Sequence, residues 1–115
     1  MMFDSKRMQI MTSGLDALAT QQKTILHNLS NLETPGYKAK RVVFEDILRD
    51  KQGRYQVRHR VETSEDTARR PDGNNVDTDA ESLRLFENYT QQQYLFQKIS
   101  GQFNNYRYVL KSGPK

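Results

Sequence analysis

Two apolar stripes, one toward each end of the 115-residue chain, constrain its fold more than any other feature. Along each stripe, the intervals between successive positions alternate strictly between three and four residues, and Gln22 and Gln92 are the only polar members. An alternation kept over several heptads is typical of a coiled-coil seam, not of the broader face that packs on a globular core. The first predicted seam consists of Met8, Met11, Leu15, Leu18, Ile25, Leu29 and Leu32, and the second of Leu85, Tyr89, Phe96, Ile99, Phe103, Tyr106 and Leu110.

The stripes predict a mainly α protein in which two long terminal helices form an antiparallel coiled coil. Thr78 and Glu81 have the spacing of a capping box, so the second helix is expected to run from about Asp79 to Leu110. The predicted organisation is one structural domain, with a coiled-coil helix in residues 1–34, an irregular β-containing segment in 35–75 and a coiled-coil helix in 76–115. One helix pair cannot offset the ordering entropy of about 60 residues, so neighbouring copies are expected to cover the seams.

The middle segment shows one strand signal. Apolar and polar side chains alternate from Arg54 to Thr63, as they do in a half-buried strand, and a small apolar cluster precedes it between Val42 and Leu48. Residues 64–75 are polar and are expected to form a mobile loop.

The chemistry available to this chain is limited. There is no cysteine, so it has no disulfide or thiolate metal site, and neither His27 nor His59 has a partner at catalytic or metal-ligand spacing. The oxygen-bearing side chains from Asn75 to Asp79 have calcium-loop spacing, but Ala80 stands where the loop needs Gly and Phe86 where it needs Glu. The chain is therefore predicted to be no enzyme and to use no metal or cofactor.

Charge and hydropathy narrow the possible partners. The net charge is only +4, and acidic residues are interspersed among the basic ones, which disfavours nucleic-acid binding. No stretch is apolar enough to span a membrane, and residues 1–10 lack the features of a cleaved secretory signal. Two functional classes stay open: an assembly subunit, and a basic adaptor that binds nucleic acid or an anionic surface through Arg54, Arg58 and Arg60.

The end of the first predicted helix carries a more specific pattern, made by Asn28, Asn31, Thr34, Pro35, Gly36 and Tyr37. Asn31 suits a helix terminus, Pro35 prevents helix continuation and Gly36 permits a positive φ. The whole string resembles the Asn-x-x-Asn-x-x-Thr-Pro-Gly-Tyr signature of the flagellar rod, hook and hook-associated proteins.

Two further strings narrow the resemblance. Residues 37–45 and residues 70–77 are similar to stretches of the proximal rod proteins of the FlgB type, although Arg41 stands where that family has an acidic residue. Proximal rod proteins of the FlgC type share the first signature and are the nearest alternative, but the run typical of their carboxy-terminal helix is absent.

The resemblance implies a structural subunit of the proximal rod, exported by the flagellar type III apparatus without a cleaved signal peptide and located in the periplasmic basal body. The terminal helices would line the export channel and the middle segment would face outward. The implied partners are copies of the chain, other rod proteins, MS-ring and adaptor proteins, and the export gate.

Overall fold

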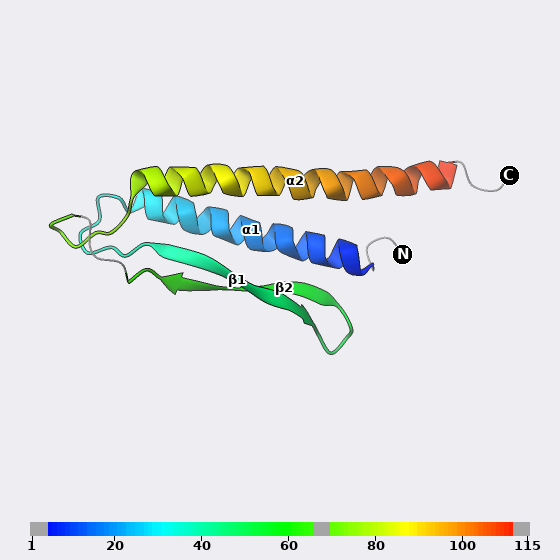
Figure 1. Ribbon diagram of the computed structural model, residues 1–115, viewed down its shortest axis with the longest axis horizontal. Coiled ribbons are helices and arrows are strands. Elements are labelled where there is room, and N and C mark those ends of the chain that lie inside the picture. The colour runs from blue at the N-terminus through cyan, green and yellow to red at the C-terminus, as the bar shows by residue number, and fades with distance from the viewer. Residues whose placement is uncertain (1–4, 66–69, 112–115) are drawn as a thin grey trace.

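The computed structural model describes residues 5–65 and 70–111 of an elongated molecule, with extents of 72 × 30 × 15 Å. Its elements follow in the order α1 (Lys6–Ser30), β1 (Lys40–Arg49), β2 (Tyr55–Thr63) and α2 (Thr78–Lys111). The two helices lie side by side and run in opposite directions, and α2 extends beyond the start of α1 (Figure 1). The chain is thus mainly helical, with a small antiparallel sheet, as predicted.

Both ends of α1 follow from local side-chain chemistry. The Ser5 hydroxyl accepts a hydrogen bond from the Met8 N–H at 3.1 Å, which caps the first turn. At the other end, Asn31 is the C-cap residue. Gly36 has a φ of +74°, a conformation that costs glycine little, so the predicted turn is confirmed.

The start of α2 differs from its prediction. Asp77, not Thr78, caps the helix, because its Oδ1 accepts from the N–H groups of Asp79 at 3.1 Å and Ala80 at 3.3 Å. Glu81 does not reach back to complete a capping box; its carboxylate is fully buried and binds other elements. The predicted capping box is therefore wrong, although the helix begins within a residue of the expected place.

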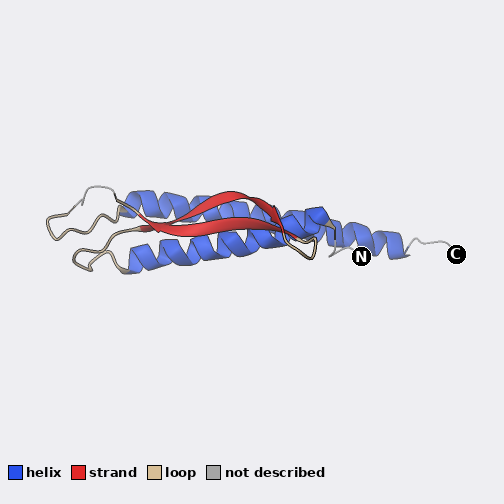
Figure 2. Cartoon of the chain, turned by 90° about the horizontal axis from the view of Figure 1, so that it is seen from below, coloured by secondary structure: helices blue, strands red, loops and turns tan. Residues whose placement is uncertain are grey.

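The middle segment contains two strands where the sequence predicted one. β1 pairs antiparallel with β2, and the pairing shifts between Phe44 and Asp46, so that Glu45 is the extra residue of a bulge. The hairpin follows the length of the helix pair (Figure 2). Two side chains of α1 accept hydrogen bonds from backbone N–H groups of β2, Gln9 from Tyr55 at 2.7 Å and Ser13 from Val57 at 2.6 Å.

α1 is the central element, since it contacts both the hairpin and α2. Met8, Ala17, Leu18 and Ile25 form most of the small buried core. Gly14 allows a close approach, because a Cβ there would lie 3.4 Å from Leu95 Cδ1 of α2 and 3.8 Å from Val57 Cγ2 of β2. Over residues 5–65 and 70–111, no helix has the length and hydropathy that crossing a bilayer requires.

Candidate assembly site

A buried polar junction joins the end of α1 to the starts of β1 and α2, and Asn28 is its centre. The Asn28 side-chain amide donates to the Lys40 carbonyl at 2.8 Å and to Glu81 Oε2 at 3.2 Å. Its Oδ1 accepts from the Lys40 N–H at 2.9 Å and from the Tyr37 hydroxyl at 2.8 Å. Asn28 is fully buried, so the first residue of the family signature links three elements.

Glu81 brings a charge into this junction. Its Oε1 lies 2.7 Å from Arg41 Nη1 and 3.1 Å from Arg84 Nη1. The carboxylate is inaccessible to solvent, whereas both arginines are partly exposed. A buried carboxylate requires such partners, so Arg41, which departs from the family pattern, has a defined structural role here.

The segment before α2 closes the junction from the other side. The buried Asn74 amide donates to the carbonyls of Asn31 at 2.9 Å, Leu32 at 3.2 Å and Thr34 at 2.8 Å, and so binds the turn that follows α1. The neighbouring Asn75 Oδ1 accepts from the Ala39 N–H at 2.7 Å.

The expectation of a mobile loop over residues 64–75 is consequently wrong for its last part, where Asn74 and Asn75 are buried. Buried, satisfied amides fix a backbone that composition alone assigns to a loop. Residues 66–69 lie outside the described residues.

The remaining signature residues lie at the edge of the junction. The Thr34 hydroxyl donates to Asn31 Oδ1 at 3.0 Å, and His27 Nδ1 lies 2.9 Å from the Tyr37 hydroxyl oxygen. Burial, and then the nearby Glu81 carboxylate, raises the pKa of Tyr37 above its usual value. Pro35 and Gly36 are exposed, and the Gly36 N–H donates to the Asp72 carbonyl at 2.8 Å. The signature turn at Gly36 and the stretch of residues 70–77 are therefore hydrogen-bonded to each other.

The predicted seam of α1 faces the interior of the single chain. Met8, Leu18 and Ile25 are buried, and Met11, Leu15, Leu29 and Leu32 are partly buried.

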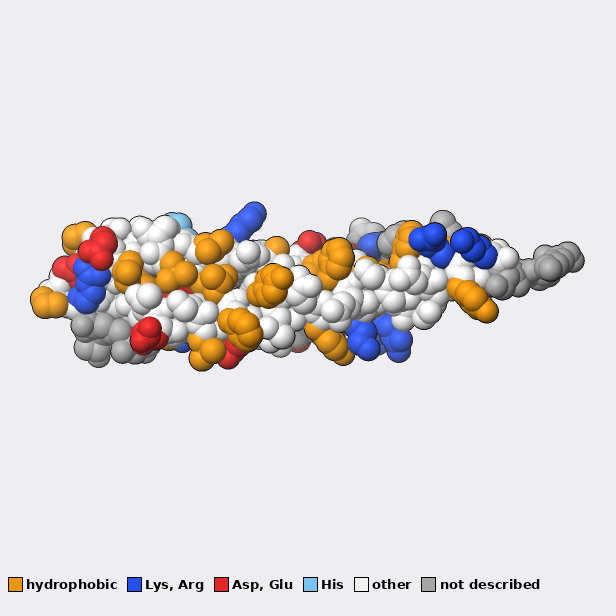
Figure 3. All heavy atoms as spheres, turned by 90° about the horizontal axis from the view of Figure 1, so that it is seen from above, with side chains coloured by type: hydrophobic (Ala, Val, Ile, Leu, Met, Phe, Trp, Pro, Cys, Tyr) orange, Lys and Arg blue, Asp and Glu red, His pale blue; other side chains and the backbone are white. Residues whose placement is uncertain are grey.

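The predicted seam of α2 lies differently. Tyr89 is 60% exposed, Phe96 61% and Phe103 44%, and Tyr106 and Leu110 are also exposed. Leu85 and Ile99 are half-buried. Apolar side chains are visible along this surface of α2 in Figure 3. The structure therefore leaves most of this seam without a partner in its own chain.

The face of α2 that meets α1 includes buried and half-buried polar side chains, of which the predicted stripe contained Gln92 but not Asn88 or Glu81. The Asn88 amide is buried and donates to the Leu18 carbonyl and to Gln21 Oε1, both at 2.8 Å. One turn later, the Gln92 amide donates to Gln22 Oε1 at 2.9 Å. Asn88 and Gln92 carry amide side chains four residues apart, and so lie on the same face of α2. This spacing is the signal that could have indicated the polar face.

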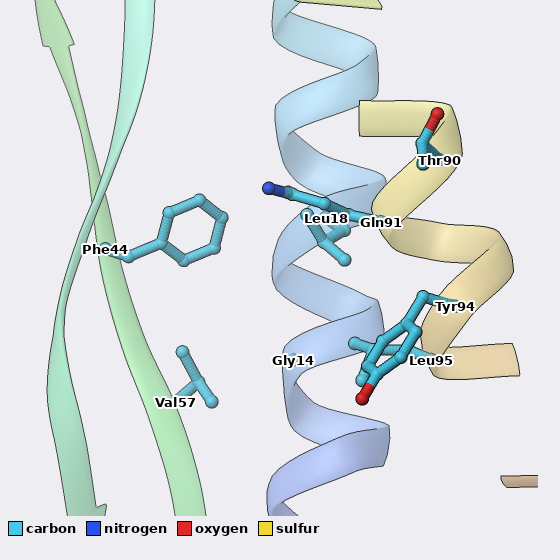
Figure 4. A pocket seen from close by; sticks show the side chains of 8 residues that line it. All are labelled: Gly14, Leu18, Phe44, Val57, Thr90, Gln91, Tyr94 and Leu95. Carbon is cyan, nitrogen blue, oxygen red and sulfur yellow. The ribbon is translucent and has the colours of Figure 1, made fainter. Parts of the chain in front are cut away.

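An apolar groove of about 540 Å³ opens between the hairpin and α2, above α1. Figure 4 shows Phe44 and Val57 on the hairpin side, Leu18 on α1, and Tyr94 and Leu95 on α2. The groove holds no acid, base or nucleophile arranged for catalysis among its lining residues. Its chemistry suits the packing of another apolar surface.

Two of the three arginines of the alternative, basic-adaptor interpretation, Arg58 and Arg60, form ion pairs within the hairpin. Arg58 Nε lies 2.8 Å from Glu45, and Arg60 lies 2.7 Å from Glu45 and 2.6 Å from Glu62. Arg54 also has a partner. The carboxylates that neutralise Arg58 and Arg60 disfavour a polyanion site on this strand.

Comparisons with known proteins identify relatives of this chain. A family model described as flagella basal body rod protein matches residues 8–38, which include α1 from Met8 onward and the signature turn. The flagellar basal body rod protein FlgB of Bacillus subtilis (strain 168) is 32% identical over 124 aligned residues, which cover 95% of this chain and 96% of that relative.

Proposed function

The chain belongs to the family of flagellar basal body rod proteins of the FlgB type, and from this premise we propose that its helices build the rod by packing against neighbouring subunits. It is a structural subunit of the flagellar basal body rod, and the family is not one of enzymes. The α2 seam holds the subunit in place by forming coiled-coil contacts with adjacent helices.

One observation carries this proposal. Tyr89, Phe96 and Phe103 recur at heptad spacing on α2, yet each is exposed in the single chain. A row of aromatic side chains left in water is unfavourable until a partner covers it, and large exposed apolar patches mark interaction surfaces. The partly buried positions of the α1 seam, such as Met11 and Leu15, and the apolar groove above Leu18 offer further contact area for the same packing.

The resemblance to the family supports the remaining parts of the proposal. We place the subunit in the periplasmic part of the basal body, reached through the flagellar export apparatus, with the paired helices around the export channel and the β1–β2 hairpin outward. Its proposed neighbours are copies of the chain, other rod proteins, the MS-ring and adaptor proteins and the export gate. Assembly through the seams requires no cofactor.

The substitution Phe96→Asp tests the seam. Covering Phe96 stabilises the contact by roughly 2–3 kcal/mol in each subunit, and an unpaired carboxylate in its place adds a further penalty. Since Phe96 is exposed in the single chain, we expect the stability of the monomer to change by no more than about 0.5 kcal/mol. In a strain lacking the native subunit, the variant should be produced but not incorporated into purified basal bodies, and cells should not swim.

Gln97→Asp is the matched control, because it adds the same charge at the adjacent, exposed position. It should support swimming. Normal incorporation of Phe96→Asp would show that this face of α2 is not buried in the rod.

A further inference from the structure

The apolar groove and the aromatic row of the seam lie on different flanks of α2. Tyr94 and Leu95 line the groove, whereas Tyr89, Phe96 and Phe103 form the exposed row. At about 3.6 residues per turn, Tyr94 lies about 140° around the helix from Tyr89. A helix that covers the aromatic row therefore leaves the groove open, and burial of the groove requires a second surface.

The surface of α2 that joins these two flanks has the composition of a protein interface. Between Asn88 and Tyr106, α2 carries one charged residue, Lys98, although most of this stretch is exposed. The Lys98 ammonium lies over the Tyr94 ring, 5.5 Å from its centroid. Depletion of charged residues together with enrichment in aromatic ones is typical of interface cores. A helix face that stays in water carries charged and polar residues instead.

The lining of the groove is uncharged as well. Phe44 and Val57 of the hairpin, Leu18 of α1 and Gln91 of α2 lie around it (Figure 4). Its volume of about 540 Å³ is within the range of pockets that enclose a drug-sized group. A charged group placed in the groove would find no counter-charge among these lining residues, so the groove suits an uncharged apolar occupant.

Gly14 lies in the floor of the groove and supports a close approach by an occupant. Glycine within a helix is less favourable than alanine. Packing within the chain does not account for it, because a Cβ at this position would make ordinary contacts, 3.4 Å from Leu95 Cδ1 and 3.8 Å from Val57 Cγ2. The missing methyl group instead deepens the groove where another element can come near α1.

We propose that the groove receives an α-helix of a neighbouring rod subunit, one that presents an uncharged apolar row at heptad spacing. This inference rests on the proposed assembly function and names the contact on the flank of α2 that the seam does not use. Related subunits bring helices, since the family model matches α1 from Met8 onward. The aromatic row of α2 shows that a member of this family can expose such a row. Because α1, α2 and the hairpin each supply a wall, the contact requires the folded subunit.

Photo-crosslinking in assembled basal bodies identifies the occupant. Benzoylphenylalanine in place of Gln91 should form adducts with apolar heptad positions of a helix in a rod subunit, located by mass spectrometry of purified basal bodies. The same probe in place of Lys23, an exposed residue of α1 outside the groove lining, should not form this adduct.

Gln91→Asp measures the contribution of the groove to assembly. Gln91 is exposed in the single chain, so the urea midpoint of the purified variant should match that of the wild type. Burying an unpaired carboxylate against an apolar helix should lower incorporation into basal bodies at least about tenfold. Gln97→Asp, the same change outside the groove lining, should be incorporated normally.

The proposal is overturned if the adducts from position 91 lie on a strand, on a loop or on a charged surface, or if no protein adduct forms, as with a lipid occupant. Normal incorporation of Gln91→Asp would also overturn it. Failure of the groove is separable from failure of the seam, because Phe96→Asp alters the other flank of α2 and should still prevent incorporation when the groove is irrelevant.

Discussion

Asn28→Ala should strongly destabilise the subunit, even though the same change is favourable at an ordinary helix position. The substitution removes four hydrogen bonds at a fully buried site. The Tyr37 hydroxyl still has His27 beside it, so the main losses fall on the Lys40 backbone groups and on Glu81 Oε2. Each buried group left unpaired costs about 1–3 kcal/mol, which gives a total of roughly 3–5 kcal/mol.

Intrinsic helix propensity acts in the opposite direction. Alanine is favoured over asparagine in a helix by up to about 0.7 kcal/mol. Asn105→Ala, at an exposed position of α2, isolates that gain and should stabilise the chain slightly.

Urea unfolding followed by far-UV circular dichroism measures both variants. With an m-value of about 1–3 kcal/mol/M, the midpoint for Asn28→Ala should fall by at least 1 M while that for Asn105→Ala holds or rises. Equal midpoints for Asn28→Ala and the wild type would refute the conclusion that the polar junction stabilises the contact of α1 with β1 and α2.

Three further changes test other contacts. Because the pKa of Tyr37 is raised in the folded chain, the unfolded chain ionises first, and the free energy of unfolding should fall as pH rises through about 10. Chemical denaturation between pH 9 and 11 should show a smaller fall in this free energy for Tyr37→Phe than for the wild type. An equal fall in both proteins would contradict this. Gly14→Leu should lower stability by about 1–3 kcal/mol in thermal unfolding, since its side chain would collide with Leu95, whereas Gly14→Ala should be tolerated. Arg41→Asp should lower the free energy of unfolding by roughly 3–5 kcal/mol, because it replaces the closest cation of buried Glu81 by a second carboxylate. Arg41→Met should lower it less. Equal unfolding midpoints for the two variants would argue against an electrostatic role of Arg41.

The sequence was most informative where local backbone chemistry decides the structure. The end of α1 at Asn31, the positive φ of Gly36 and the β2 strand all follow from residue types at fixed positions. β1 was missed because its bulge at Glu45 interrupts the alternation of apolar side chains, leaving Phe44 and Ile47 three residues apart.

Contacts between distant segments were harder to predict. Hydrophobic periodicity locates an apolar stripe but cannot say whether that stripe meets the same chain or another one. On α2, the surface toward α1 carries Glu81 and Asn88, whose burial becomes favourable only because Asn28 and the Leu18 carbonyl lie opposite. Likewise, Asn74 is a residue type common in loops, and its structural role becomes recognisable only when the carbonyls of Asn31 and Thr34, just after α1, lie opposite its amide.

The polar contacts between α1 and α2 also make the subunit a spacer of defined length. One helical turn advances about 5.4 Å, so sliding α2 along α1 by a turn would move Asn88 away from the Leu18 carbonyl. Leucine side chains could re-form equivalent contacts after such a shift, but a buried amide has few alternative partners. The positions of the turn at Gly36 and of the projecting end of α2 are therefore set relative to each other within each molecule. A tube built from such units would keep a constant axial repeat and would transmit torque without its subunits lengthening.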